Sequence, residues 1–584
     1  MREATDAYVT KIISNDKEQI IVAIEYCNAL PAGNNAWQRN GRAIACAEMG
    51  IPYFYYADVG GVELDGDRGI KAPRFPNPIV PFSYLTAGTS LQVICIPIYE
   101  AHPAITETLR NKFINVFGLE DSIRLIRCLL YETNTADALN VLIAKGTALV
   151  KILSNDRKRV DTLRGTQWDD FIENTSGIKK AEWLMQHSKH LVWKKKQSNK
   201  VNTTKQFNEL IRQVQRLNCL SVGASEIPIC LVPYTKLCDF ATIVENNYPN
   251  QNILIKTLKE LRQPIIIVWI TGFKPRGDDS RPDRGIVPLA RMLFGNDINI
   301  LTIVSGPAKK ETWMIFEKNP KKLAKENGLW EAIINLSNFV FIDSVTSKKG
   351  AMFYEVECNL TRNQKPVIFN KATTKDLIYS EHDTDTAIHS IYSNRQKEGV
   401  FESMCNPPGG DWSGISVIDF QSNREYRWTS LPRVSSVQAK RPDHVIQILH
   451  KNGYIFLAIE SKTSSVDLDD EIGTRLTTYI KELFRNYPTA YRKKDENWKS
   501  YDKNNAPFSK FTAFSGGAFC FKNDQEMLEA LTKGNLDFIM SFEFRPVGQK
   551  SILHIKVTEQ CQFLIVLTTN LCRQSGAGVE IKIH

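Results

Sequence analysis

The sequence has no stretch of about 18 apolar residues, the length that a membrane-spanning helix requires. Its first residues, MREATDAYVT, also lack the apolar run of a secretory signal. We therefore expect a cytoplasmic protein with no membrane partner.

Several motifs of well-known chemistry are also missing. The twelve cysteines include no CxxC pair, and Cys230 and Cys238, the closest two, have no histidine nearby. The nine histidines form no HExxH pattern, and no GxxxxGK[ST] loop is present. These gaps disfavour a zinc site, histidine-based nuclease chemistry and an ATP-driven motor, and they indicate buried thiols in a reducing compartment.

Composition and length indicate a large globular protein. The chain has 584 residues, 42% apolar and 24% charged, with a formal charge of +10 that favours a polyanionic partner without identifying one. Short apolar strands alternate with helical patterns, which is typical of an α/β protein. We predict three α/β domains, over residues 1–180, 205–370 and 375–584.

The most informative pattern lies near the C-terminus. Pro442-Asp443 opens an apolar strand, Asn452-Gly453 is a favoured hairpin turn, and the return strand is apolar until Glu460. Lys462 follows at spacing i, i+2, which places it on the same strand face as Glu460. Charged residues at the end of a buried strand are costly unless they line a cleft or coordinate something.

Hairpin pairing can bring Asp443 close to Glu460. Two carboxylates at one point suit Mg²⁺, which retains waters and accepts phosphate oxygens. The metal lowers the pKa of water and stabilises charge on a phosphodiester, while Lys462 can orient that water or offset developing charge. We therefore expect Asp443, Glu460 and Lys462 to catalyse phosphodiester hydrolysis, with Asp443 and Glu460 as metal ligands.

These residues resemble the motif of the PD-(D/E)xK nuclease superfamily: Pro442-Asp443, sixteen intervening residues, then Glu460-x-Lys462. The resemblance covers the C-terminal third of the chain and implies an α/β (α+β) core with a mixed central sheet flanked by helices. It also implies an acidic metal ligand from the preceding helix. Our candidate is Glu402, which we expect in a helical stretch, with Glu398 second.

Within the superfamily the chain looks most like a type II restriction endonuclease. That resemblance implies site-specific cleavage of double-stranded DNA with Mg²⁺, a homodimer at least on DNA, and a cognate DNA methyltransferase as companion. Two alternatives stay open. One is another nuclease of this superfamily, acting in repair or on modified DNA, and the other is a non-catalytic DNA-binding protein.

The N-terminus repeats part of the same pattern. Asp6 opens a strand, and the return strand brings Glu25 and then Cys27, where the motif would have lysine. Arg39 and Arg42 follow and could contact phosphate. Residues 1–80 are either a degenerate nuclease-like fold used for DNA binding, an unrelated α/β edge, or a second active site.

Two basic segments are candidates for DNA contacts. The loop GDDSRPDRG could bind metal through Asp278, Asp279 and Asp283, but no ExK follows, so we favour DNA recognition by Arg276, Arg281 and Arg284. The alternative is a solvated, salt-bridged loop. Between residues 179 and 205, eight lysines face one acid, and we expect them either to contact phosphate or to form a solvated linker. The DNA-binding candidates there are Lys194, Lys195 and Lys196, with Arg441 beside the C-terminal site.

Overall fold

The computed structural model shows a mixed α/β chain that divides into two compact units. Unit 1 contains residues 1–61 and 74–370, and unit 2 contains residues 62–73 and 371–584. The structure describes residues 5–27, 35–60, 64–65, 69–70, 75–102, 105–156, 168–187, 204–217, 220–221, 229–271, 285–305, 314–315, 318–326, 328–343, 351–356, 358, 360, 363, 365–370, 379–405, 414–429, 439–451, 453–486, 508, 510–545, 549–575 and 579–584.

The first sheet of unit 1 has the order β1-β2-β3-β6, with β13 pairing at β2. The β1–β2 pair is the predicted N-terminal hairpin and is antiparallel, whereas β2–β3 and β3–β6 are parallel. Its strands are β1 (Ala7–Ser14), β2 (Lys17–Cys27), β3 (Tyr53–Val59), β6 (Cys95–Ala101) and β13 (Ile368–Asn370). The associated helices are α1 (Asn35–Glu48), α2 (Ile79–Ser90), α3 (Glu107–Phe113), α4 (Leu119–Leu130), α5 (Ala136–Asp156), α6 (Asp169–Glu173) and α7 (Gly177–His187).

Alternate residues of β2 face two different hydrophobic clusters. Ala23 and Cys27 belong to the large core that also contains Ile44 of α1, while Val22 packs with Leu125 of α4 and Leu142 of α5. Glu25 has the parity of Ala23 and Cys27, so it lies on the α1 face of the sheet.

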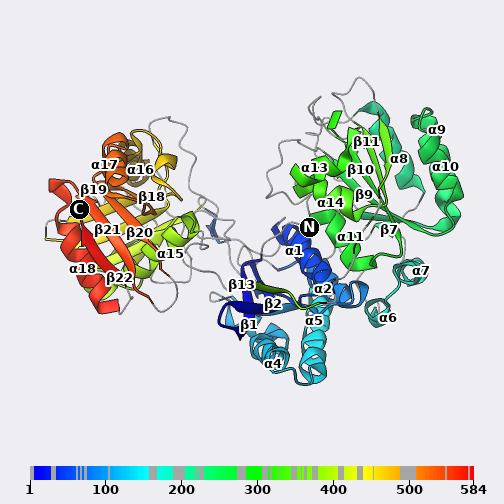
Figure 1. Ribbon diagram of the computed structural model, residues 1–584, viewed down its shortest axis with the longest axis horizontal. Coiled ribbons are helices and arrows are strands. Elements are labelled where there is room, and N and C mark those ends of the chain that lie inside the picture. The colour runs from blue at the N-terminus through cyan, green and yellow to red at the C-terminus, as the bar shows by residue number, and fades with distance from the viewer. Residues whose placement is uncertain are drawn as a thin grey trace. The chain divides into compact units, whose positions relative to one another are not determined.

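The second sheet of unit 1 has the order β12-β11-β10-β9-β8-β7, with parallel pairs at β9–β10 and β10–β11. Its strands are β7 (Leu220–Ser221), β8 (Ile229–Val232), β9 (Ile265–Thr271), β10 (Asn299–Ser305), β11 (Phe339–Asp343) and β12 (Met352–Glu355). Its helices are α8 (Lys205–Arg216), α9 (Leu237–Asn247), α10 (Asn252–Glu260), α11 (Ile286–Phe294), α13 (Pro320–Glu326) and α14 (Gly328–Leu336). Because helices cover both faces of the sheet (Figure 1), β9 is a continuous apolar run.

One hydrophobic core joins the two sheets of unit 1. It contains Tyr55 of β3 and Ile266 of β9, and the helices α2 and α11 pack against each other within it. The two regions predicted as an N-terminal and a middle domain therefore pack into a single unit.

Unit 2 is built on a seven-stranded sheet of order β14-β17-β18-β19-β20-β21-β22. The pairs β18–β19, β19–β20 and β21–β22 are parallel and the other pairs are antiparallel, so the sheet is mixed. Its strands are β14 (Val400–Met404), β17 (His444–His450), β18 (Gly453–Ser461), β19 (Phe511–Cys520), β20 (Phe538–Glu543), β21 (Ser551–Val557) and β22 (Val579–Ile583). Its helices are α15 (Glu381–Tyr392), α16 (Ile472–Asn486), α17 (Asp524–Lys533) and α18 (Phe563–Ser575).

Helices cover both faces of this sheet (Figure 1). One face packs against α16 and α17, and the other packs against α15 and α18. The side of α16 that packs on the sheet carries Ile472, Leu476, Ile480 and Leu483, all of which are buried. At the hairpin, Gly453 has a φ of 140°, and a Cβ there would lie 2.5 Å from the carbonyl oxygen of Lys510.

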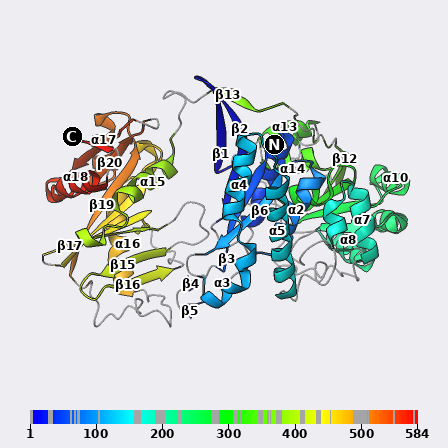
Figure 2. The ribbon, with the colours of Figure 1, turned by 90° about the horizontal axis from the view of Figure 1, so that it is seen from below.

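Two small antiparallel ribbons complete the described structure: β15 (Gly414–Asp419) with β16 (Arg424–Thr429), and β4 (Leu64–Asp65) with β5 (Gly69–Ile70). The first ribbon lies beside β17 (Figure 2), where Ile418 donates its N–H to Gln447 Oε1 at 2.7 Å. Among the described residues, no helix is long and apolar enough to span a membrane.

Candidate functional site

The hairpin β17–β18 holds Asp443 directly opposite Glu460. His444 pairs with Ile459 in the antiparallel register. Asp443, one residue before His444, therefore lies opposite Glu460, one residue after Ile459. Asp443 donates its N–H to the carbonyl of Ile459 at 2.9 Å, and its Oδ2 accepts the N–H of Ser461 at 2.9 Å. Two backbone contacts thus fix the main chain and the carboxylate of Asp443.

Glu460 is almost fully buried, with its side chain 3% exposed. Its Oε1 contacts the ammonium groups of Lys440 and Lys462, the latter at 2.7 Å. Its Oε2 is buried and has no hydrogen-bond partner among the described residues. A buried carboxylate oxygen without a donor is costly, so this position favours a cation.

Lys462 lies within 4.0 Å of three acids. Its Nζ is 2.7 Å from Glu460 Oε1, 3.6 Å from Glu381 Oε1 and 4.0 Å from Asp443 Oδ2. The predicted placement of Glu460 and Lys462 on one face is confirmed by the first of these distances. The side chains of Asp443 and Lys462 are 16% and 19% exposed, so the site is partly open to solvent.

Burial and mutual repulsion set the electrostatics of the two acids. Desolvation raises the pKa of Asp443, and the charges of Asp385 and Glu381 raise it further. The pKa of Glu460 is also raised, first by desolvation and then by the charge of Asp443. Burial tends to lower the pKa of Lys462, but its contacts with Glu460 and Asp443 outweigh burial and raise it. The site therefore favours bound positive charge.

The prediction that Glu402 lies on a helix and joins this site is wrong. Glu402 lies on β14, opposite Ile446, and it has the parity of Val400, which packs in the core beneath α15. It therefore lies on the opposite face of the sheet from Asp443 and Glu460. There its carboxylate contacts His389 at 2.7 Å and His444 at 2.9 Å, and Glu398 lies in a short 3-10 turn.

The acidic residues that accompany the site come from α15 instead. Glu381 is in the first turn of α15, and its N–H donates to Thr463 Oγ1 at 3.2 Å, one residue after Lys462. Asp385, one turn later, contacts His444 Nε2 at 2.9 Å. Sequence reasoning missed both residues. A recognisable signal was present, because Ser380 begins a helix with a capping box and Glu381 and Asp385 follow at spacing i, i+4, which places them on one helix face.

The N-terminal candidates Asp6 and Glu25 also come together. Tyr26 donates its N–H to Asp6 Oδ2 at 2.8 Å, and Glu25 is fully buried. Arg39 and Arg42, expected to contact phosphate, instead bind the Glu25 carboxylate, with Arg39 Nε at 3.2 Å from Oε1. Cys27 is buried in the core.

The other predicted residues fall into two groups. Arg276, Asp278, Arg281, Asp283, Arg284, Lys194, Lys195 and Lys196 lie outside the described residues. Arg441 is described and half-buried, two residues before Asp443. The expectation that the lysines of residues 179–205 share one role is wrong at Lys180, which is buried and donates to Ser90 Oγ at 2.6 Å.

A further group that could hold a metal ion is Asp524, His554 and His584. His554 Nδ1 lies 2.7 Å from His584 Nε2, and His584 Nδ1 lies 3.2 Å from Asp524 Oδ2. Both ring nitrogens of His584 therefore contact other members of this group.

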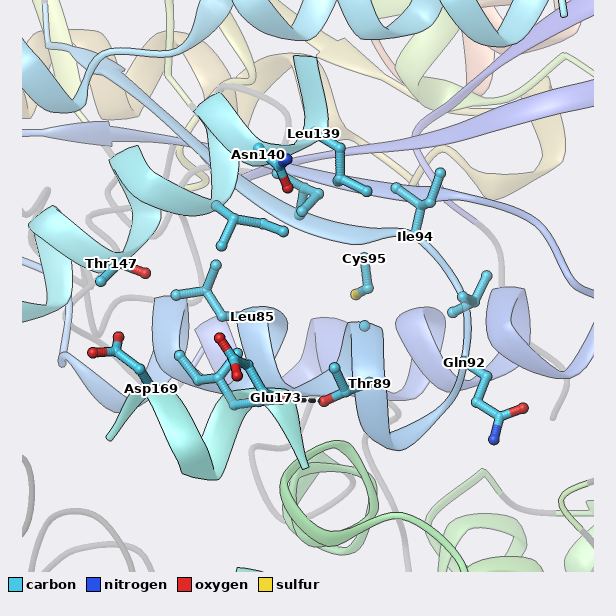
Figure 3. Close-up of a pocket in the computed structure, with 15 residues that line it drawn as sticks. Leu85, Thr89, Gln92, Ile94, Cys95, Leu139, Asn140, Thr147, Asp169 and Glu173 are labelled. Carbon is cyan, nitrogen blue, oxygen red and sulfur yellow. Dashed lines mark hydrogen bonds between the residues drawn. The ribbon is translucent and has the colours of Figure 1, made fainter. Parts of the chain in front are cut away.

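Unit 1 contains a cavity of about 540 Å³ between α2, α5, α6 and β6 (Figure 3). Leu85, Ile94 and Leu139 line it with aliphatic groups, and Asp169 and Glu173 lie together along one side. None of the predicted site residues lines this cavity. Its lining is mainly apolar.

Comparisons of the chain with protein-family models, with curated proteins and with solved structures find no match.

Proposed function

We propose that unit 2 is a Mg²⁺-dependent nuclease core of the PD-(D/E)xK type that hydrolyses phosphodiester bonds in double-stranded DNA. The observation that carries this proposal is the meeting of Asp443, Glu460 and Lys462 at the open end of one hairpin. The mixed sheet with helices on both faces supports it, as does α15, which brings further acids to the same edge.

The residues present fit a magnesium ion. Asp443 and Glu460 offer hard carboxylate oxygens, and the buried Glu460 Oε2 has no donor among the described residues. When bound there, Mg²⁺ supplies Lewis acidity that activates water and stabilises negative charge on the phosphodiester. Glu381 is the third acid near Lys462, and its side chain is 44% exposed.

The remaining side chains hold and orient the reactants. The Ser461 amide fixes the Asp443 carboxylate in one rotamer, which reduces the entropy lost when substrate binds. Lys462 donates toward the attacking water or a phosphate oxygen and offsets charge in the transition state. Lys440 contacts the buried carboxylate of Glu460 and lies 3.5 Å from Asp469, so its positive charge offsets the negative charge of Glu460.

Within this class we propose a type II restriction endonuclease. The formal charge of +10 favours a nucleic acid. Cutting both strands usually takes two such sites, so we expect a homodimer on DNA. A cognate methyltransferase would protect the host sequence. The protein would act in the cytoplasm.

The decisive experiment incubates the purified chain with unmethylated phage DNA, in Mg²⁺ or in EDTA. Asp443→Ala and Lys462→Ala are compared with Lys550→Ala, a control that removes an exposed lysine of the same unit. We expect discrete fragments from the wild type and the control in Mg²⁺, and none in EDTA or from the two site variants.

The other outcomes are equally informative. Cutting that persists in both site variants would move catalysis away from Asp443 and Lys462. DNA binding without cutting by the wild type in any divalent metal would establish a non-catalytic binding protein. Cleavage confined to modified DNA would leave the active site in place but replace the restriction assignment with a modification-dependent nuclease.

A further inference from the structure

The Asp6–Glu25 pair of unit 1 is built like the Asp443–Glu460 pair of unit 2. Ala7 pairs with Ile24 as His444 pairs with Ile459, so in each hairpin the acid before the first strand lies opposite the glutamate. In each, the residue after that glutamate donates its backbone N–H to the aspartate Oδ2. Tyr26 donates to Asp6 at 2.8 Å, and Ser461 donates to Asp443 at 2.9 Å.

The surrounding sheets have the same construction. The series β1-β2-β3-β6 and β17-β18-β19-β20 both run antiparallel, parallel, parallel. A helix follows the second strand in each, α1 after β2 and α16 after β18. Glu25 lies on the α1 face and Glu460 on the α16 face, as strand parity with neighbouring core residues requires.

The two sites differ in the groups that contact their carboxylates. Arg42 of α1 contacts Glu25 Oε1 and lies 3.4 Å from Asp6 Oδ1, so one guanidinium bridges both acids. Arg39 adds a second contact to Glu25 Oε1 at 3.2 Å. The counterpart of Lys462 is Cys27, which is buried in the hydrophobic core.

An unsatisfied oxygen remains in both sites. Glu25 is fully buried, and its Oε2 has no hydrogen-bond partner among the described residues, as is also true of Glu460 Oε2. Desolvation raises the pKa of Glu25 despite the opposing contact with Arg42. The arginines therefore neutralise the acids without satisfying every oxygen that a metal could ligate.

We infer that unit 1 contains a second carboxylate site of the same construction, in which the Arg42 guanidinium takes the place of a divalent cation. The site is closed to metal in the native chain and becomes a Mn²⁺ or Mg²⁺ site when Arg42 is removed. It does not hydrolyse DNA, because Cys27 supplies no ammonium group and is buried. This goes beyond the proposed function and does not rest on nuclease activity, since its test measures metal binding.

The test uses the full chain with Asp443→Asn and Glu460→Gln, which remove the carboxylate pair of unit 2. Mn²⁺ binding is measured by electron paramagnetic resonance, and thermal unfolding is followed with and without Mn²⁺. This background should bind no Mn²⁺ at unit 1. Adding Arg42→Ala should create about one site per chain and a melting temperature that rises with Mn²⁺, because a ligand that binds only the folded state stabilises it.

Two further variants serve as controls. Arg39→Ala leaves the Arg42 guanidinium on both acids and should bind no Mn²⁺, whereas Glu25→Gln added to Arg42→Ala should abolish the new site. Mn²⁺ binding at Asp6 and Glu25 while Arg42 is present would overturn the inference, and so would a folded Arg42→Ala chain that binds none at millimolar Mn²⁺. The first of these measurements needs no change in unit 1, so a folding defect of Arg42→Ala cannot prevent it.

Failure of the proposed function would look different. If the wild-type chain binds as much Mn²⁺ as the background with the unit 2 substitutions, the metal role of Asp443 and Glu460 is wrong. The result for Arg42→Ala would stand independently of that outcome.

Discussion

Ser461 donates its backbone N–H to the Oδ2 atom of Asp443 at 2.9 Å, across the open end of the β17–β18 hairpin. Asp443 lies just before the first residue of β17, and this contact holds its carboxylate in place. A carboxylate held by the main chain keeps its geometry when neighbouring side chains change. Single substitutions around Asp443 should therefore separate metal binding from catalysis.

Lys462→Ala should abolish cleavage while leaving metal binding intact. The ammonium group competes with a cation for Glu460 Oε1 at 2.7 Å, so its removal should leave Mn²⁺ affinity equal or higher. The cleavage rate should fall at least about 100-fold, the usual effect of losing a charge-stabilising donor. Titration of Mn²⁺ and single-turnover cleavage measure the two effects, and Glu460→Gln should lose both. Weakened Mn²⁺ binding by Lys462→Ala would contradict the assigned role.

Glu381→Gln and Glu402→Gln should have opposite consequences. Glu381 is 44% exposed and faces Lys462, so its neutralisation should slow cleavage by about tenfold with an unchanged melting temperature. Glu402 is buried and bonded to His389 and His444, so its variant should melt at a lower temperature but cleave normally once folded. Loss of cleavage by Glu402→Gln alone, with native stability, would restore that residue to the site.

His444→Ala should destabilise unit 2. His444 is fully buried, with Nδ1 at 2.9 Å from Glu402 and Nε2 at 2.9 Å from Asp385. Without it, Asp385 and Glu402 lose a buried cationic partner, which typically costs about 3 kcal/mol or more. Urea unfolding followed by circular dichroism measures the loss, and His450→Ala, at an exposed position on the same strand, is the matched control. Equal stability of the two variants would contradict this account.

The sequence predicted the parts of the site that depend on neighbouring residues. The Asn-Gly turn and the apolar run before Glu460 define one hairpin, and hairpin register alone places Asp443 opposite Glu460. The i, i+2 spacing then places Lys462 beside Glu460. The roles of these residues in magnesium binding and cleavage stay predictions.

The parts that depend on distant packing could not be predicted. Glu402 is near the site in sequence, but β14 places it on the opposite face of the sheet, where the buried His444 and the exposed His389 bond to its carboxylate. Glu381 reaches the site because the start of α15 is bonded to Thr463, a contact between residues 82 positions apart. Similarly, Arg42 reaches Glu25 only because α1 packs on the face of β2 that carries it.

Lys180→Met should stabilise unit 1 near neutral pH and lose that effect at pH 10. Desolvation lowers the pKa of Lys180 to about 7, while in the unfolded chain it returns to its usual value near 10.5. The unfolded state therefore binds more protons between these values, and the wild type gains stability as pH rises from 7 to 10.5. The pKa shift sets an upper bound of about 5 kcal/mol on the gain in the free energy of unfolding at pH 7. We expect a gain on the order of 2 kcal/mol, because methionine cannot make the bond to Ser90.

The measurement compares urea unfolding of the variant and the wild type at pH 7 and pH 10, so that other titrating groups cancel. Lys179→Met is the matched control, since Lys179 is exposed on the same helix and should show no such difference. A stabilisation of equal size at both pH values would show that packing is responsible instead of the buried charge. A destabilised variant at pH 7 would show that the bond from Lys180 to Ser90 Oγ outweighs the cost of burying the ammonium group.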